Sequence, residues 1–245
     1  MSIQYHLPLS LVVSLMRDAL LARKRNFRKD SLTCVKELHP PLLVLSAQHI
    51  PTGGPCVVTV NHYSRPGFGA WWLALSIAAL VPVDMHWVMT GELLYLGRLG
   101  SPISRCVLQR IGRVYDFTVM PPMPPRPQDI EARARAVQTV IKRMQQNGNE
   151  VLGLAPEGSD QPKGKLAYPP PGVGRFGLLL AGLGCKFVPV GAYETETAFC
   201  LRFGPAYSLQ VSPGLSASER DRLAANIIMQ HIAALLPEHL RGEFA

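Results

Sequence analysis

The stretch "CVVTVNHYSRPGFGAWWLALSIAALV", residues 56–81, decides the fold because it joins three kinds of sequence. Residues 56–60 are apolar or β-branched and predict a buried strand. The polar segment "NHYSRPG" follows as a turn, and an apolar run of helical length then begins at Gly69. Proline and glycine on either side confine that helix to residues 69–81, which is too short for a membrane span. A strand followed by a turn and a buried helix is typical of α/β proteins.

The same alternation continues along the chain. Further strands are predicted at residues 41–45, 85–89, 113–117, 150–155, 186–193 and 199–204, and further helices at 102–111, 129–146, 173–183 and 216–236. Strands that alternate with helices imply a largely parallel sheet. We therefore predict one α/β domain, residues 31–245, with a largely parallel mixed sheet flanked by helices.

Residues 1–30 form a separate pattern. The apolar segment "LPLSLVV" leads into a basic cluster of five residues, Arg23, Lys24, Arg25, Arg28 and Lys29. An apolar helix followed by basic residues predicts an amphipathic helix that contacts an anionic membrane surface. The alternative is an ordinary amphipathic helix that packs on the domain.

The composition of the chain limits the cellular compartment and the kinds of partner that we expect. The chain has 245 residues, of which 47% are hydrophobic and 17% charged, and a net charge of +8 that favours anionic partners. The five cysteines have no metal-ligand or disulfide spacing, and we find no secretory signal or nucleic-acid-binding motif. His231 and His239 lack a third ligand, so no metal is expected. These features predict a cytoplasmic protein, peripheral on the inner face of the membrane, that does not bind nucleic acid.

Two polar turns follow predicted strands of the sheet. Asn61 and His62 follow residues 56–60, and "PEGSD", residues 156–160, follows residues 150–155. Ligands of such sheets bind beyond the carboxyl ends of the strands, so both turns are expected to face one site. A histidine there can take a proton from a hydroxyl near neutral pH.

Four motifs in order resemble the glycerolipid acyltransferases, the family of the glycerol-3-phosphate and 1-acylglycerol-3-phosphate enzymes. "NHYSRPG" is similar to their first motif, Asn-His-x4-Asp, at Asn61, His62 and Ser64. "TGELLYLGRLGSPISRCVLQRIGRVYDF" resembles the second motif region, "NGNEVLGLAPEGSD" the third and "CKFVPVGAY" the fourth. The resemblance covers about residues 41–193 and implies a glycerol-3-phosphate acyltransferase-like fold.

The resemblance also implies a reaction. A fatty acyl group would move from an acyl thioester, acyl-CoA or acyl carrier protein, to a hydroxyl of a (lyso)glycerolipid or related lipid, with no cofactor. His62 would be the catalytic base, and the substrate-binding residues would be Asn61, Ser64, Arg65, Arg113, Glu157, Gly158 and Lys163. Base catalysis of this kind contributes typically ~10²–10⁴-fold.

Two positions depart from the family pattern. Gly67 stands where the first motif has aspartate, and Asp160 stands where the third motif has arginine. The carboxylates that are candidates to orient His62 instead are Asp84, Glu92, Asp116 and Asp160, and Arg65, Arg113, Lys163 and Lys165 are candidate replacement cations. The alternative function is a lipid-binding or regulatory relative that has lost turnover.

Overall fold

The computed structural model describes residues 3, 5–93, 96–123, 126–161 and 164–245 and contains one seven-stranded sheet. The strand order is β1-β7-β6-β2-β5-β3-β4, with β2 and its neighbours β6 and β5 at the centre. The strands are β1 (Leu43–Leu45), β2 (Cys56–Val60), β3 (Met85–Thr90), β4 (Thr118–Met120), β5 (Val151–Leu154), β6 (Lys186–Glu194) and β7 (Phe199–Phe203). All the pairs are parallel except β6 with β7. The predicted α/β fold with a largely parallel mixed sheet is therefore confirmed.

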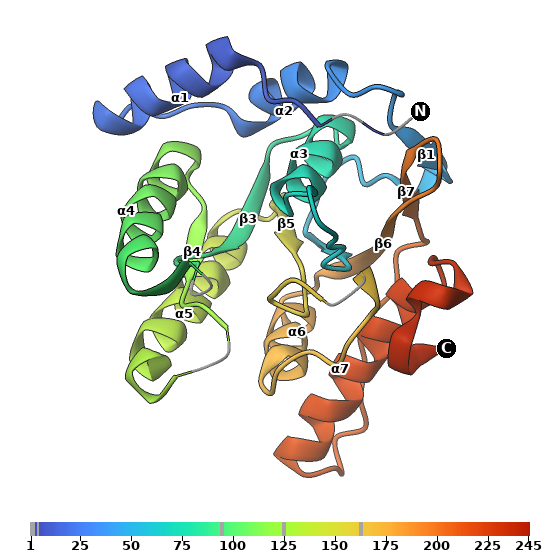
Figure 1. The fold of residues 1–245 in the computed structure, drawn as a ribbon. Helices are drawn as coiled ribbons and strands as arrows, with labels where there is room; N and C mark the ends of the chain where they lie inside the picture. Colours follow the sequence, from blue (N-terminus) through green and yellow to red (C-terminus); the bar gives the residue numbers. More distant parts are fainter. Residues whose placement is uncertain (1–2, 4, 94–95, 124–125, 162–163) are drawn as a thin grey trace.

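Helices cover the sheet on both sides (Figure 1). They are α1 (Leu9–Leu20), α2 (Phe27–Lys36), α3 (Trp71–Leu80), α4 (Gly97–Tyr115), α5 (Ile130–Gln146), α6 (Val173–Gly182) and α7 (Ala217–Ala233). Helices α2 and α3 pack on each other, as do α6 and α7, and Figure 1 shows the strands between these two layers. Every residue of β2 is buried, which explains why residues 56–60 read as a continuous apolar run.

The strand predicted at residues 113–117 is wrong. Arg113 to Tyr115 are the last turn of α4, which begins at Gly97 rather than at residue 102. The helix ends at Asp116, whose φ of 59° is left-handed, and β4 begins only at Thr118. The β-branched and aromatic residues of "RVYDF" suggested a strand, but Val114 is buried as a helical residue.

The N-terminal segment contains two helices rather than one. The chain leaves α1 after Leu20 and begins α2 at Phe27, where the side chain of Asn26 accepts a hydrogen bond from the Lys29 amide. Asparagine is a favoured N-cap, and it starts the second helix here. The division expected at residue 30 therefore falls inside α2.

Candidate active site

Three neighbouring parallel strands end at the same edge of the sheet, and polar residues follow each of them. The register pairs Val60 of β2 with Val190 of β6, and Thr59 of β2 with Leu154 of β5. The turn after β2 consequently contacts both Glu157 and Glu194, although these residues are far apart in sequence. The expected meeting of the two polar turns at this edge is observed.

Asn61 ties the first turn to β6. Its side-chain amide donates to the Ala192 carbonyl at 2.9 Å, and its carbonyl oxygen accepts from the Ala192 amide at 2.7 Å. Asn61 is buried, so its side chain continues the strand pairing beyond the last residue of β2. Its observed contacts are with the protein backbone, and they hold the turn that carries His62.

Glu157 joins the two turns. One carboxylate oxygen accepts from the His62 backbone amide at 2.6 Å, and the other accepts from the Ala167 amide at 3.0 Å. Burial raises the pKa of this carboxyl group, although both backbone hydrogen bonds act in the opposite direction. Gly158 follows with φ of 72°, a left-handed conformation that suits glycine in a tight turn.

The ring of His62 faces a carboxylate. Its Nδ1 lies 3.2 Å from Oδ1 of Asp160, a distance that is within ion-pair reach. Nδ1 is buried, and the direction of the contact falls outside good hydrogen-bond geometry within the described part of the chain. Nδ1 thus has a carboxylate within reach but no aligned hydrogen bond, which is common for catalytic contacts before substrate binds. The contact lowers the pKa of Asp160 against the raising effect of partial burial.

The other three acidic candidates are engaged elsewhere. Each accepts hydrogen bonds or forms ion pairs away from His62: Asp84 with Asn26, Glu92 with Arg105 and Arg126, and Asp116 with Lys24 and Arg143. Among the four candidates, Asp160 is therefore the one that lies beside His62.

Arg65 contacts a residue that the sequence did not indicate. Its guanidinium makes two hydrogen bonds with the carboxylate of Glu194, one of them from Nη2 to Oε1 at 2.7 Å. The hydroxyls of Tyr5 and Tyr63 donate to the same carboxylate at 2.7 and 2.9 Å. Burial would raise the pKa of Glu194, but these donors lower it. Arg65 therefore anchors the turn, and its charge is already compensated.

Gly67 stands where the first motif has aspartate, and its backbone conformation is one that side chains rarely adopt. Its φ of 81° is left-handed, and a Cβ at this position would meet Nη1 of Arg65 at 3.3 Å as its nearest neighbour. A side chain at position 67 would therefore begin beside Arg65.

The remaining predicted site residues do not all lie at this edge of the sheet. Ser64 lies half-buried in the turn beside His62. Arg113 is exposed on the last turn of α4, which leads into the amino end of β4, so it lies at the opposite edge of the parallel sheet. Lys163 lies outside the described residues. The sequence did not indicate Glu194, because it lies at the end of a predicted strand and belongs to no recognised motif.

Two surface hollows lie away from this site. They measure about 470 and 440 Å³ and share Gly184 and Lys186, at the amino ends of β2 and β6. Neither is lined by a carboxylate. The candidate site is therefore marked by its polar side chains and not by either of these hollows.

The motifs and the fold agree with comparisons to known proteins. A family model described as Acyltransferase matches residues 42–193, which is more than half of the chain. The chain belongs to the acyltransferase family. No curated protein matches this family member.

A solved structure shows the same fold. It is the crystal structure of the 1-acyl-sn-glycerophosphate (LPA) acyltransferase PlsC from Thermotoga maritima, with a TM-score of 0.51 and 16% sequence identity. The match covers 92% of this acyltransferase-family chain and 80% of the other. The predicted fold and family are thus confirmed together.

Proposed function

We propose that this protein transfers a fatty acyl group from an acyl thioester to a hydroxyl of a (lyso)glycerolipid or related lipid, with His62 as the general base. The observation that carries the proposal is the position of His62. It lies at the carboxyl edge of the central strands, with its backbone held by Glu157 and its Nδ1 beside Asp160. A proton on Nδ1 leaves Nε2 free to accept another proton.

The chemistry follows from this arrangement. Nε2 takes the proton of the acceptor hydroxyl while the hydroxyl oxygen attacks the carbonyl carbon of the thioester. The C–S bond then breaks, and the proton on Nε2 passes to the departing thiolate. The products are an ester and a free thiol, so neither an acyl-enzyme nor a cofactor is needed. The donor, acyl-CoA or acyl carrier protein, is a co-substrate.

Helix α1 supports a site at the membrane surface. Its buried residue is Asp18, at 7% exposure, whereas its large apolar side chains Leu9, Val13, Met16 and Leu20 are exposed. The spacing of these four places them on one face of the helix. An apolar face that points away from the protein core needs another partner.

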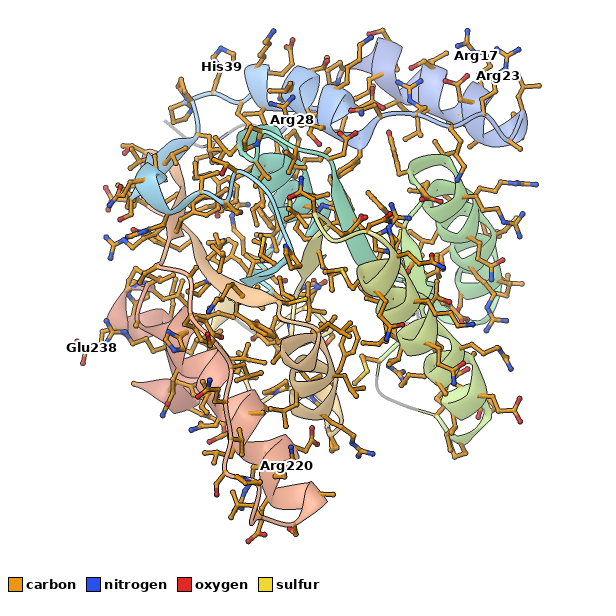
Figure 2. The ribbon with its side chains drawn as sticks, turned by 180° about the vertical axis from the view of Figure 1, so that it is seen from behind. Arg17, Arg23, Arg28, His39, Arg220 and Glu238 are labelled. Atoms are coloured by element: carbon orange, nitrogen blue, oxygen red, sulfur yellow. The ribbon has the colours of Figure 1, made fainter. Side chains whose placement is uncertain are left out.

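The charges around α1 favour an anionic lipid surface as that partner. Arg17 and Lys24 pair with Asp18 and Asp116, but their side chains remain 62% and 65% exposed. Figure 2 shows Arg17 and Arg23 at the outer end of α1. Arg25 belongs to the fold instead, because it pairs with Asp18 and Asp30. Apolar insertion together with nearby basic residues is how interfacial helices bind lipid. Within the described chain, no helix has the length and apolarity needed to cross a bilayer.

Vesicle co-sedimentation tests the membrane proposal. The protein should bind phosphatidylglycerol vesicles more than phosphatidylcholine vesicles, and less at high salt because charges are screened. Leu20→Glu should weaken binding, whereas Leu179→Glu, an exposed leucine on α6, should not. Equal binding by both variants and the wild type would contradict a membrane-binding role for α1.

Incubation with labelled acyl thioesters tests the enzymatic proposal. Purified protein is mixed with labelled acyl-CoA or acyl carrier protein and with lysolipids, and ester products are separated from free acid. We expect a labelled ester whose formation is lost in His62→Ala. A lipid-binding relative without turnover, which the glycine at position 67 favours, would instead retain lipid binding and form no ester.

A further inference from the structure

Asp160 stands out among the polar residues near the candidate base. Its Oδ1 lies 3.2 Å from Nδ1 of His62, and the other three acidic candidates are bonded to different partners. It follows β5, the strand directly beside the one that His62 follows. The same turn contains Glu157, which accepts a hydrogen bond from the His62 backbone. Two carboxylates of a single turn therefore contact His62: Glu157 at its backbone and Asp160 at its ring.

We propose that Asp160 is the positioning residue for His62, and so replaces from a different turn the carboxylate that is absent at position 67. This inference rests on the proposed function and specifies how its base is oriented. Asp160 accepts the Nδ1 proton, which fixes the tautomer in which Nε2 is unprotonated and can act on the acceptor hydroxyl. When Nε2 takes that proton, the adjacent carboxylate stabilises the positive ring.

An aspartate at position 67 would be strained and would begin beside a cation. A Cβ there would begin 3.3 Å from Nη1 of Arg65, and the backbone is left-handed with φ of 81°. Arg65 is itself fixed to Glu194. A carboxylate at position 67 would therefore meet a cation first, whereas Asp160 already reaches the ring.

The exposure of Asp160 sets the size of the expected effect. Its side chain is 55% exposed, so water weakens its interaction with His62 relative to the fully buried aspartate of a serine hydrolase. Loss of that buried residue costs on the order of 10⁴-fold in rate, and we expect a smaller loss of about 100-fold here. The loss should fall on kcat and leave KM nearly unchanged, because the ring acts in the transition state.

The kinetic test compares Asp160→Asn with Asp160→Glu and with Glu131→Gln. Glu131 is 87% exposed on α5, so its variant is a matched carboxylate-to-amide control that should keep wild-type activity. Asp160→Glu should recover part of the activity lost in Asp160→Asn. In the double variant His62→Ala with Asp160→Asn, the loss should equal that of His62→Ala alone, since Asp160 acts through the ring. An unchanged kcat in Asp160→Asn, with His62-dependent turnover in the wild type, would overturn the inference and leave the proposed function intact.

A spectroscopic test does not depend on turnover. The ¹⁵N chemical shifts of the His62 ring show which nitrogen carries the proton. We expect the proton on Nδ1 in the wild type and in Glu131→Gln, and a mixture of tautomers in Asp160→Asn at unchanged melting temperature. The same tautomer in all three proteins would refute the positioning role. Absence of ester formation by the wild type would refute the proposed function, while the tautomer measurement would still decide the pairing.

Discussion

In the turn after β2, His62 and Arg65 each face an acidic residue, and the two acidic residues lie in different environments. Glu194, the partner of Arg65, has a side-chain exposure of 9% and accepts from three side chains. Asp160, the partner of His62, is 55% exposed. The carboxylate of Glu194 is buried and fully bonded, whereas that of Asp160 is accessible and keeps unused acceptor capacity. The turn is thus anchored at Arg65, while the partner of His62 stays open to solvent.

Breaking the ion pair between Arg65 and Glu194 should have the largest effect on stability. Arg65→Met leaves Glu194 buried with only two tyrosine donors, and we expect a loss of about 3 kcal/mol in the free energy of unfolding. Asp160→Asn removes a half-exposed carboxylate and should change the stability far less. Urea unfolding of both variants measures the difference. Equal losses would show that the two pairs play the same role.

His86, on β3, should affect the pH dependence of stability. It is buried, its Nε2 lies 2.8 Å from Oγ1 of Thr118, and burial lowers its pKa to about 4. The folded pKa is below the unfolded value of about 6.5, so its contribution is present above pH 6.5 and is lost as the pH falls toward 4.

The size of this loss can be measured. At pH 5 we expect about 2 kcal/mol less stability than at pH 7 from this group. His86→Gln should remove that component of the pH dependence, whereas His62→Gln should leave it in place. The same slope in wild type and His86→Gln would contradict the assignment.

Glu157 holds the backbone of His62 and of Ala167 through its two carboxylate oxygens. In Glu157→Gln only one oxygen remains to accept, so either the His62 or the Ala167 amide loses its partner and faces an amide donor. We expect a loss of about 1–2 kcal/mol, together with lower activity because His62 shifts. Thermal unfolding and kcat are the measurements, with Glu131→Gln as the exposed control.

Restoring the aspartate of the first motif should have the smallest effect on stability. Gly67→Asp places a side chain at φ of 81°, at a cost of about 1 kcal/mol, and directs it toward Arg65. We expect no increase in kcat. An increase would show that position 67 does reach His62 and would weaken the case for Asp160.

The sequence predicted the sheet well because its central strands are buried on both faces. The runs at residues 56–60 and 186–193 have no competing helical pattern, and they match β2 and β6 closely. Residues 113–117 were misassigned because local β-propensity is weak where an amphipathic helix continues. The two-helix N-terminus depends on a single asparagine cap, which the apolar and basic pattern does not reveal.

The site was predictable only in part. His62, Asn61 and Glu157 follow from the motifs and from the position of the turns. The choice of Asp160 among four acids, however, depends on the adjacency of β2 and β5. The sequence suggests Arg65 as a substrate-binding cation because a cation in a polar turn has no visible partner in sequence. Its partner Glu194 comes from the end of β6 and becomes evident only when the sheet is assembled.

The most direct test of acyl transfer by His62 is ester formation from a labelled acyl thioester and a lysoglycerolipid, by wild type and by His62→Ala at equal melting temperature. Our proposal predicts labelled ester from the wild type and a loss of about 10²-fold or more in kcat for the variant. Equal ester formation by both proteins, or none by the wild type with any donor and acceptor, would contradict it.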